Sequence, residues 1–79
     1  MARFVLNLHA QRQAQRREVT YEDVGYVLDN FDERRPARVI PGRLPSEFFV
    51  ATVRGSRMRV YAEIGSEPIM VTTVAWEER

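Results

Sequence analysis

The sequence predicts an α+β domain in which two helices cover one face of a twisted antiparallel sheet of four to five strands. Three observations support this prediction. Apolar and polar residues alternate over 2–8, as expected for a strand. Two helix-forming segments follow at 10–18 and 21–30. The C-terminal half holds three strand-like runs, at 47–54, 57–64 and 69–76. The predicted order is therefore β-α-α-(β)-β-β-β.

The helix predicted over 21–30 has a clear start signal and one apolar face. Thr20 and Asp23 have the spacing of a capping box. Glu22 and Asp23 place carboxylates in the first turn, where the helix dipole favours them. The apolar residues recur at helical spacing: Val24, Val27, Leu28 and Phe31.

The helix predicted over 10–18 is rich in arginine and glutamine and has a narrower apolar face. Asn7 or His9 is the candidate for its N-cap. Ala10 and Ala14 form its only apolar stripe, so we expect it to lie on the surface of the sheet.

A β-hairpin is predicted around Gly55-Ser56, since a Gly-first two-residue loop suits a type II′ turn. The register that follows places Val53 opposite Met58. Six apolar residues then share one face: Phe49, Ala51, Val53, Met58, Val60 and Ala62. The other face carries Arg57, Arg59 and Tyr61, and no segment of the sequence is expected to cover it.

The segment between the second helix and the hairpin is the least regular. Residues 30–36 are expected to form a polar loop. Over 37–46, a short edge strand at Val39 and Ile40, ended by Pro41, is an alternative to a loop. The final strand at 69–76 is hydrophobic on both sides, which favours a central position.

Length and composition limit the classes of function. The 79 residues form one domain, 1–79, near the lower end of what folds without a disulfide or a metal. The chain has no cysteine and one histidine, so we predict no disulfide, no metal site and no cofactor. No apolar run approaches the roughly 18 residues that cross a membrane, and no signal peptide is recognisable. The expected location is the cytoplasm, without membrane contact.

The charges are unusual in type and in order. All 12 basic residues are arginine. Codon usage in a high-GC genome is one explanation; the other is that the planar guanidinium recognises phosphate and carboxylate groups. Residues 3–17 contain Arg and no acid, whereas 18–33 contain acids and no base. Such blocks can build a basic patch at a net charge of +1.

The strongest candidate site is the arginine-bearing strand. Arg54, Arg57 and Arg59 are candidates to hold phosphates, and Tyr61 is a candidate to stack on a base. The candidates to extend this RNA-binding or partner-binding patch are Arg12, Arg16 and Arg17. The alternative is a solvated strand face on which arginine keeps the sheet soluble.

His9 is the candidate proton-transfer residue, because only a histidine has an ordinary pKa near neutrality. Its alternative role is a structural cap. The sequence contains no Gly-rich phosphate loop, nucleophile elbow or zinc-protease motif. Glu22 and Asp23 are assigned to the helix dipole, and Asp29, Asp32 and Glu33 to a solvated helix end, with no catalytic role.

The stretch HAQRQAQRREVTYEDVGYVL at 9–28 resembles the motif of small BrnT-related domains of bacteria and phages, within the RelE/ParE-like toxin superfamily. That motif is His-Ala-x-x-Arg-x-x-x-Arg-Gly-Ile-Ser/Thr-x-x-Asp-Val. The matching residues are His9, Ala10, Arg17, Thr20, Asp23, Val24 and Leu28, with Val19 at the aliphatic position. Gln13 replaces the first motif Arg, and Glu18 replaces the motif Gly. MRVYAEI and VTTVAW resemble the last two strands of the family.

This resemblance implies a RelE-like fold and, by analogy with related toxins, a metal-independent endoribonuclease held inactive by an antitoxin. In such an enzyme a ribose 2′-hydroxyl attacks the adjacent phosphate. Arg54, Arg57 and Arg59 would stabilise the developing charge, with His9 or Tyr61 transferring the proton. Many members of the superfamily have no demonstrated activity.

Two functions follow as hypotheses. The first is a toxin-like RNA-binding or RNA-cleaving domain of a toxin–antitoxin type system. The second is a non-enzymatic protein-binding module, such as a small phage-encoded inhibitor of a host nucleic-acid machine. The expected partners are an antitoxin or another protein, with RNA, the ribosome or a second copy of the chain as further candidates.

Overall fold

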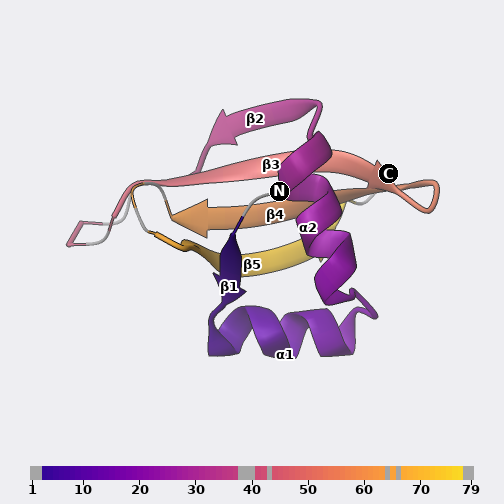
Figure 1. Ribbon diagram of the computed structural model, residues 1–79, viewed down its shortest axis with the longest axis horizontal. Coiled ribbons are helices and arrows are strands. Elements are labelled where there is room, and N and C mark those ends of the chain that lie inside the picture. Colours follow the sequence, from indigo (N-terminus) through magenta and orange to yellow (C-terminus); the bar gives the residue numbers. More distant parts are fainter. Residues whose placement is uncertain (1–2, 38–40, 43, 64, 66, 78–79) are drawn as a thin grey trace.

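The computed structural model describes residues 3–37, 41–42, 44–63, 65 and 67–77. Within these residues, two helices lie against one five-stranded sheet, which confirms the predicted α+β class (Figure 1). The elements are β1 (Phe4–Leu6), α1 (Leu8–Arg16), α2 (Tyr21–Asn30), β2 (Glu33–Pro36), β3 (Ser46–Val53), β4 (Ser56–Glu63) and β5 (Ile69–Trp76). The strand order is β1-β5-β4-β3-β2, so β5 is an interior strand between β1 and β4, in line with its hydrophobicity, although the middle strand is β4.

The sheet is antiparallel except at one edge. The strands from β2 to β5 form an antiparallel meander, whereas β1 runs parallel to β5. The expectation of a wholly antiparallel sheet was therefore wrong at β1. The two helices connect β1, at this edge, to β2 at the opposite edge. The meander then runs back across the sheet, and its last strand, β5, lies beside β1.

Both helices begin with the caps that the sequence suggests. The side chain of Asn7, rather than His9, caps α1 by accepting a hydrogen bond from the Ala10 amide (2.8 Å). At the start of α2, the Asp23 amide donates to the Thr20 hydroxyl, and the Thr20 amide donates to the Asp23 carboxylate, both at 3.0 Å. The capping box is therefore confirmed.

The turn between the helices has a glycine-like conformation without a glycine. Glu18 has a φ of 57°, and the Val19 amide donates to the Ala14 carbonyl (2.8 Å). This is the longer hydrogen bond of a Schellman motif, in which the residue at positive φ is usually glycine. Burial of Val19 beside the helix end stabilises the turn despite the less favourable residue.

The hairpin turn lies one residue earlier than the sequence predicts. Arg54 (φ 48°) and Gly55 (φ 83°) are its two central residues, and Val53 pairs with Ser56. Two successive positive φ values are the requirement of a type I′ turn, so the prediction of Gly55-Ser56 was wrong. The register is displaced by two residues, a change that leaves the side chains of 48–53 and 57–63 on their predicted faces, whereas Arg54 moves from the strand into the turn.

The polar segment after α2 contains a strand that the sequence analysis missed. Residues Glu33–Pro36 form β2 and pair with β3 at the sheet edge, inside the stretch predicted to be a loop. An exposed edge strand needs no apolar alternation, which removes the usual sequence signal. The alternative strand at Val39 and Ile40 lies outside the described residues.

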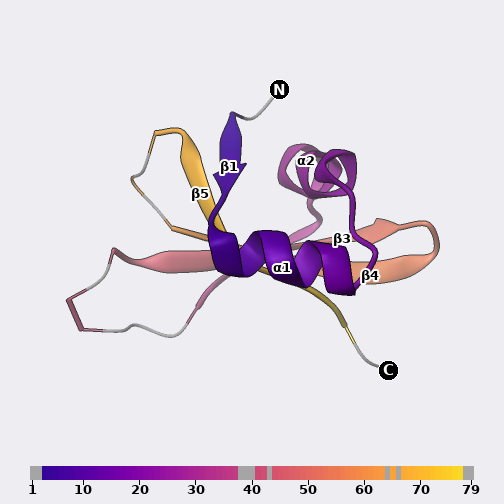
Figure 2. The same cartoon turned by 90° about the horizontal axis from the view of Figure 1, so that it is seen from below.

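The core lies between the helices and one face of the sheet. Figure 2 shows α2 on one side of the strands and α1 in front of them, where α1 packs along β5. The alanine stripe of α1 and the apolar face of α2 meet the buried residues of the strands, which include Met58, Val60, Ala62, Val71 and Val74.

Side chains from α1 complete the edge of β5 where β1 ends. The Val74 amide donates to the Gln13 carboxamide oxygen (3.1 Å), and the Arg17 guanidinium donates to the Val74 carbonyl (2.7 Å). The Trp76 indole donates to the Arg17 carbonyl (2.9 Å). Gln13, the departure from the toxin-like motif, therefore has a structural partner. None of the described helices is long and apolar enough to span a bilayer.

Candidate functional site

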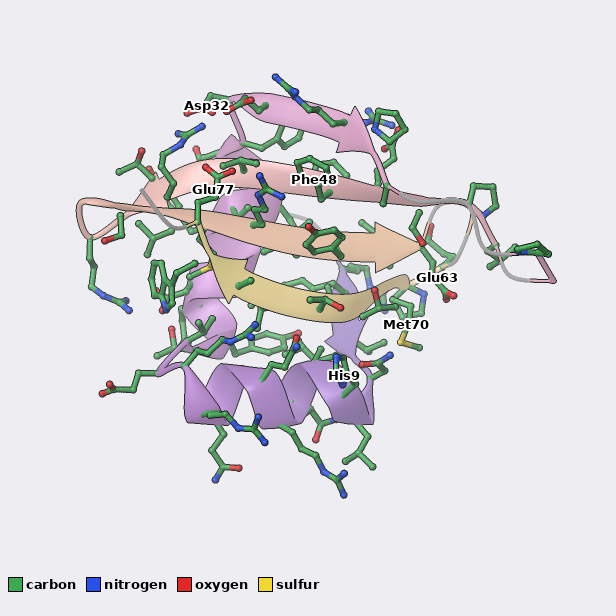
Figure 3. The ribbon with its side chains drawn as sticks, turned by 180° about the vertical axis from the view of Figure 1, so that it is seen from behind. His9, Asp32, Phe48, Glu63, Met70 and Glu77 are labelled. Carbon is green, nitrogen blue, oxygen red and sulfur yellow. The ribbon has the colours of Figure 1, made fainter. Side chains whose placement is uncertain are left out.

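The sheet face away from the helices, called the open face below, brings together three of the predicted site residues. Arg57, Arg59 and Tyr61 alternate along β4, so their side chains share this face. Tyr61 of β4 pairs with Phe48 of β3 on one side and with Thr73 of β5 on the other. Figure 3 shows Phe48 and Glu77 over this face, with Asp32 beside β2.

Arg57 is held by two carboxylates: Asp32, which precedes β2, and Glu33, the first residue of β2. Its two terminal nitrogens donate to the two oxygens of Asp32 (both 2.7 Å), and one of them also donates to Glu33 (2.8 Å). Hydrogen bonding to Asp32 raises the pKa of Arg57, and the same bonds lower the pKa of Asp32. The bidentate geometry fixes the orientation of the guanidinium plane.

Arg59 is held at the other end of the network. Its Nε donates to Glu77 (2.7 Å), its Nη1 donates to the Tyr61 hydroxyl oxygen (3.3 Å), and its guanidinium carbon lies 4.8 Å from the centre of the Phe48 ring. The Phe48 and Tyr61 rings are 5.3 Å apart. The contacts with Tyr61 and Glu77 raise the pKa of Arg59. Glu77 also lies 3.9 Å from Arg57 and so joins the two arginines.

The result is a surface of paired charges, which we call the arginine network: Asp32, Glu33, Arg57, Arg59, Tyr61 and Glu77. Three carboxylates face two guanidinium groups, so a phosphate would have to compete with carboxylates for both arginines. Val50 is 1% exposed although it lies on the open face, between Glu33 and Arg59 in the register. The network therefore also shields an apolar side chain from water.

Arg54 lies apart from the other two arginines of the predicted cradle. From the hairpin turn it reaches α2, where it donates to the buried carboxylate of Asp23 (2.7 Å), and it lies 5.8 Å from the Trp76 ring centre. Burial alone would raise the pKa of Asp23, but the Thr20 and Arg54 hydrogen bonds outweigh that effect and lower it. Arg54 therefore joins the hairpin to the helix start.

The predicted residues of α1 are also separate from the open-face set. His9, Arg12 and Arg16 are exposed, and Arg17 is committed to Val74. Figure 3 shows His9 on α1, across the sheet from Asp32. Among the described residues, no hydrogen bond joins His9 to Arg57, Arg59 or Tyr61. The proposed proton-transfer residue and the proposed cations are thus divided between two places.

Four residues of the open face were not among the predicted site residues: Asp32, Glu33, Phe48 and Glu77. Alternation along the hairpin already predicts this face for Phe48, but opposite Glu63; the observed register, displaced by two residues, places it opposite Tyr61. The acids carried no local signal, since each comes from a segment distant in sequence from β4. No group of His, Asp and Glu suited to a metal ion occurs in the described part of the chain.

Comparisons with known protein families, with curated proteins and with solved structures find no match for this chain. The resemblance to the toxin superfamily therefore stays an expectation from the motif, and the site must be interpreted from its geometry.

Proposed function

We propose that this chain is a non-enzymatic binding module that uses its open face to bind a protein partner. The observation that supports it is the state of the arginine network, in which carboxylates already orient two guanidinium groups, and Arg59 contacts the rings of Phe48 and Tyr61. Arginine and tyrosine are enriched at the energetic centres of protein interfaces. Preorganised side chains lose less entropy on binding, which favours association. The toxin-like motif adds an antitoxin-like protein to the candidate partners.

Two features argue against RNA cleavage as the primary role. Cleavage needs a proton-transfer group beside cations that are free to meet the phosphate. His9 lies on α1, away from Arg57 and Arg59, and each arginine is bound to at least one carboxylate. Tyr61 is the proton-transfer candidate within reach, and its hydroxyl contacts Arg59.

RNA binding without cleavage is a second candidate function, favoured by one specific arrangement. Phe48, Arg59 and Tyr61 form a cluster in which a guanidinium covers one ring and meets the hydroxyl of the other. Aromatic rings and arginine on a sheet surface stack on unpaired bases. Binding of this kind requires that RNA compete with Glu77 for Arg59.

The two functions can be separated with one pair of variants. Arg59→Ala with Tyr61→Ala removes the centre of the open face, and Arg34→Ala is the matched control. Arg34 is also ion-paired, to Glu47 (2.6 Å), and lies over Phe49, but from the helix side of the sheet. The tagged full-length chain is used for co-purification from the host and for binding of single-stranded RNA at several salt concentrations.

A protein that co-purifies with the wild type and with Arg34→Ala, but not with the double variant, supports the proposal. RNA affinity that falls steeply with salt and disappears in the double variant supports the second candidate instead. A partner retained equally by all three proteins would overturn the role of the open face.

A further inference from the structure

A second surface lies on the opposite side of the molecule, between β1 and α2. The structure has a hollow of about 680 Å³ there. Its lining includes Arg3, Val5, Tyr21, Glu22, Gly25 and Tyr26. We call it the β1–α2 groove. This volume is in the range of sites for small molecules or for the side chains of a short peptide. No residue of the arginine network lines it, so it is a separate surface.

One wall of the groove is an exposed aromatic ring that is nevertheless fixed. Tyr21 is 58% exposed. Its ring stacks on Phe4 at 4.4 Å between centres, and its hydroxyl donates to the Phe4 carbonyl (3.0 Å). Gly25 allows the close approach of α2 to this ring pair, because a Cβ there would lie 3.3 Å from Phe4. A rigid ring open to solvent can bind a partner with little loss of conformational freedom.

A second ring and a carboxylate stand next to it on α2. Tyr26 is 51% exposed, and Glu22 precedes it by one helical turn. Both residues also border a smaller hollow on the far side of the helix, so they form a ridge between two depressions. In the described part of the chain, no arginine pairs with Glu22, whereas arginines hold Asp23, Asp32, Glu33, Glu47 and Glu77.

The exposed edge of β1 is partly blocked to strand addition. Residues 3 and 7 bond to β5, so the Phe4 and Leu6 carbonyls point away from it. The Tyr21 hydroxyl donates a hydrogen bond to the Phe4 carbonyl, and the Gln11 carboxamide donates one to the Leu6 carbonyl (2.9 Å). Because both outward carbonyls already accept a side-chain hydrogen bond, this edge is poorly suited to the addition of a peptide strand. We therefore expect recognition at this groove to use side chains.

We propose that the β1–α2 groove binds an arginine side chain presented by a partner protein. The rings of Tyr21 and Tyr26 offer their negative faces to a guanidinium, and Glu22 supplies a carboxylate beside them. Charge complementarity favours this occupant over a phosphate, because two carboxylates, Glu22 and Asp29, line the groove against one cation, Arg3. The surface differs from the open face of the proposed function and is independent of it.

The test uses the full chain labelled for amide NMR and a capped Gly-Gly-Arg-Gly-Gly peptide as the probe. The peptide is expected to shift the amides of Tyr21, Glu22, Gly25 and Tyr26. A peptide with citrulline in place of arginine keeps the shape but not the charge, and should bind at least about threefold more weakly.

Variants then identify the groups that recognise the guanidinium. Glu22→Gln and Tyr26→Leu should each raise the dissociation constant about threefold, whereas Tyr26→Phe should leave it unchanged. Glu18→Gln, an acid-to-amide change outside the groove, is the control. Equal binding of the arginine and citrulline peptides, or shifts at Asp32 and Glu77 in place of the groove, would overturn the proposal.

Discussion

The two faces of the sheet are covered in different ways: one packs against the helices through apolar side chains, and the other carries ion-paired side chains. On the helix side, β4 contributes Met58, Val60 and Ala62, all fully buried in one apolar core. On the open side, the alternating positions of the same strand carry Arg57, Arg59 and Tyr61, which stay half-buried in the arginine network. One strand therefore separates the surface that holds the domain together from the surface that is available to a partner.

This difference has an energetic meaning. Burial of apolar area stabilises the folded state and is not weakened by ionic screening. Ion pairs at a partly exposed surface contribute little and are screened by salt. We therefore expect changes on the helix side to lower stability, and changes on the open side to alter binding.

The largest effect is expected when the core side of β4 is truncated. Met58→Ala removes the largest fully buried side chain and should lower the free energy of unfolding by about 2–5 kcal/mol. Tyr61→Ala is the comparison on the open side of the same strand and should cost about 1 kcal/mol, near the average for a single substitution. Urea unfolding measures both. Equal losses would mean that the open face is as tightly packed as the core.

The next effect concerns Asp23, the one buried carboxylate among the residues that the structure describes. Asp23→Ala removes the capping-box acceptor and the partner of Arg54, so the free energy of unfolding should fall by about 1–3 kcal/mol. Glu22→Ala, in the same turn but exposed, should cost less. Thermal unfolding at neutral pH would show this order, and a larger loss for Glu22→Ala would contradict it.

Asp23 also predicts a dependence on pH. Its pKa is lowered in the folded state, so its contribution to stability is complete above the unfolded value, near 3.8, and is lost as the pH falls through the lower folded value. The Asp32 pKa is lowered as well, through the exposed pair with Arg57. In Asp23→Ala, stability should therefore decline less between pH 5 and 2 than in the wild type. High salt should weaken only the part that depends on Asp32.

The contrast between the faces also explains which features the sequence could predict. The bounds of α2, its capping box and the apolar face of β4 depend on residues close together in the chain, and these predictions were confirmed. The hairpin turn was misplaced because Arg54 adopts a positive φ and takes the first central position of the turn. The prediction gave that position to Gly55. At position 18 the fold likewise imposes a glycine-like conformation on a glutamate.

The candidate site was only partly predictable, for the same reason. Alternation placed Arg57, Arg59 and Tyr61 on one face, but their carboxylate partners come from the chain before β3 and after β5. An apparent basic cradle therefore became a network of paired charges once the sheet was assembled. Such pairing depends on tertiary structure, which neither composition nor periodicity can supply.

The smallest effect on stability, and the most informative for function, is expected from Glu77→Gln. This change weakens the hold on Arg59 but leaves the hydrogen bond from the Glu77 amide to the Arg57 carbonyl (2.9 Å). A freed Arg59 can meet a phosphate, so affinity for single-stranded RNA should rise and its logarithmic salt dependence should steepen by about 0.7. Glu47→Gln, which frees Arg34 on the helix side, is the matched control. Equal gains in both variants would reflect net charge alone, whereas a gain confined to Glu77→Gln would show that an internal carboxylate masks the open face from nucleic acid.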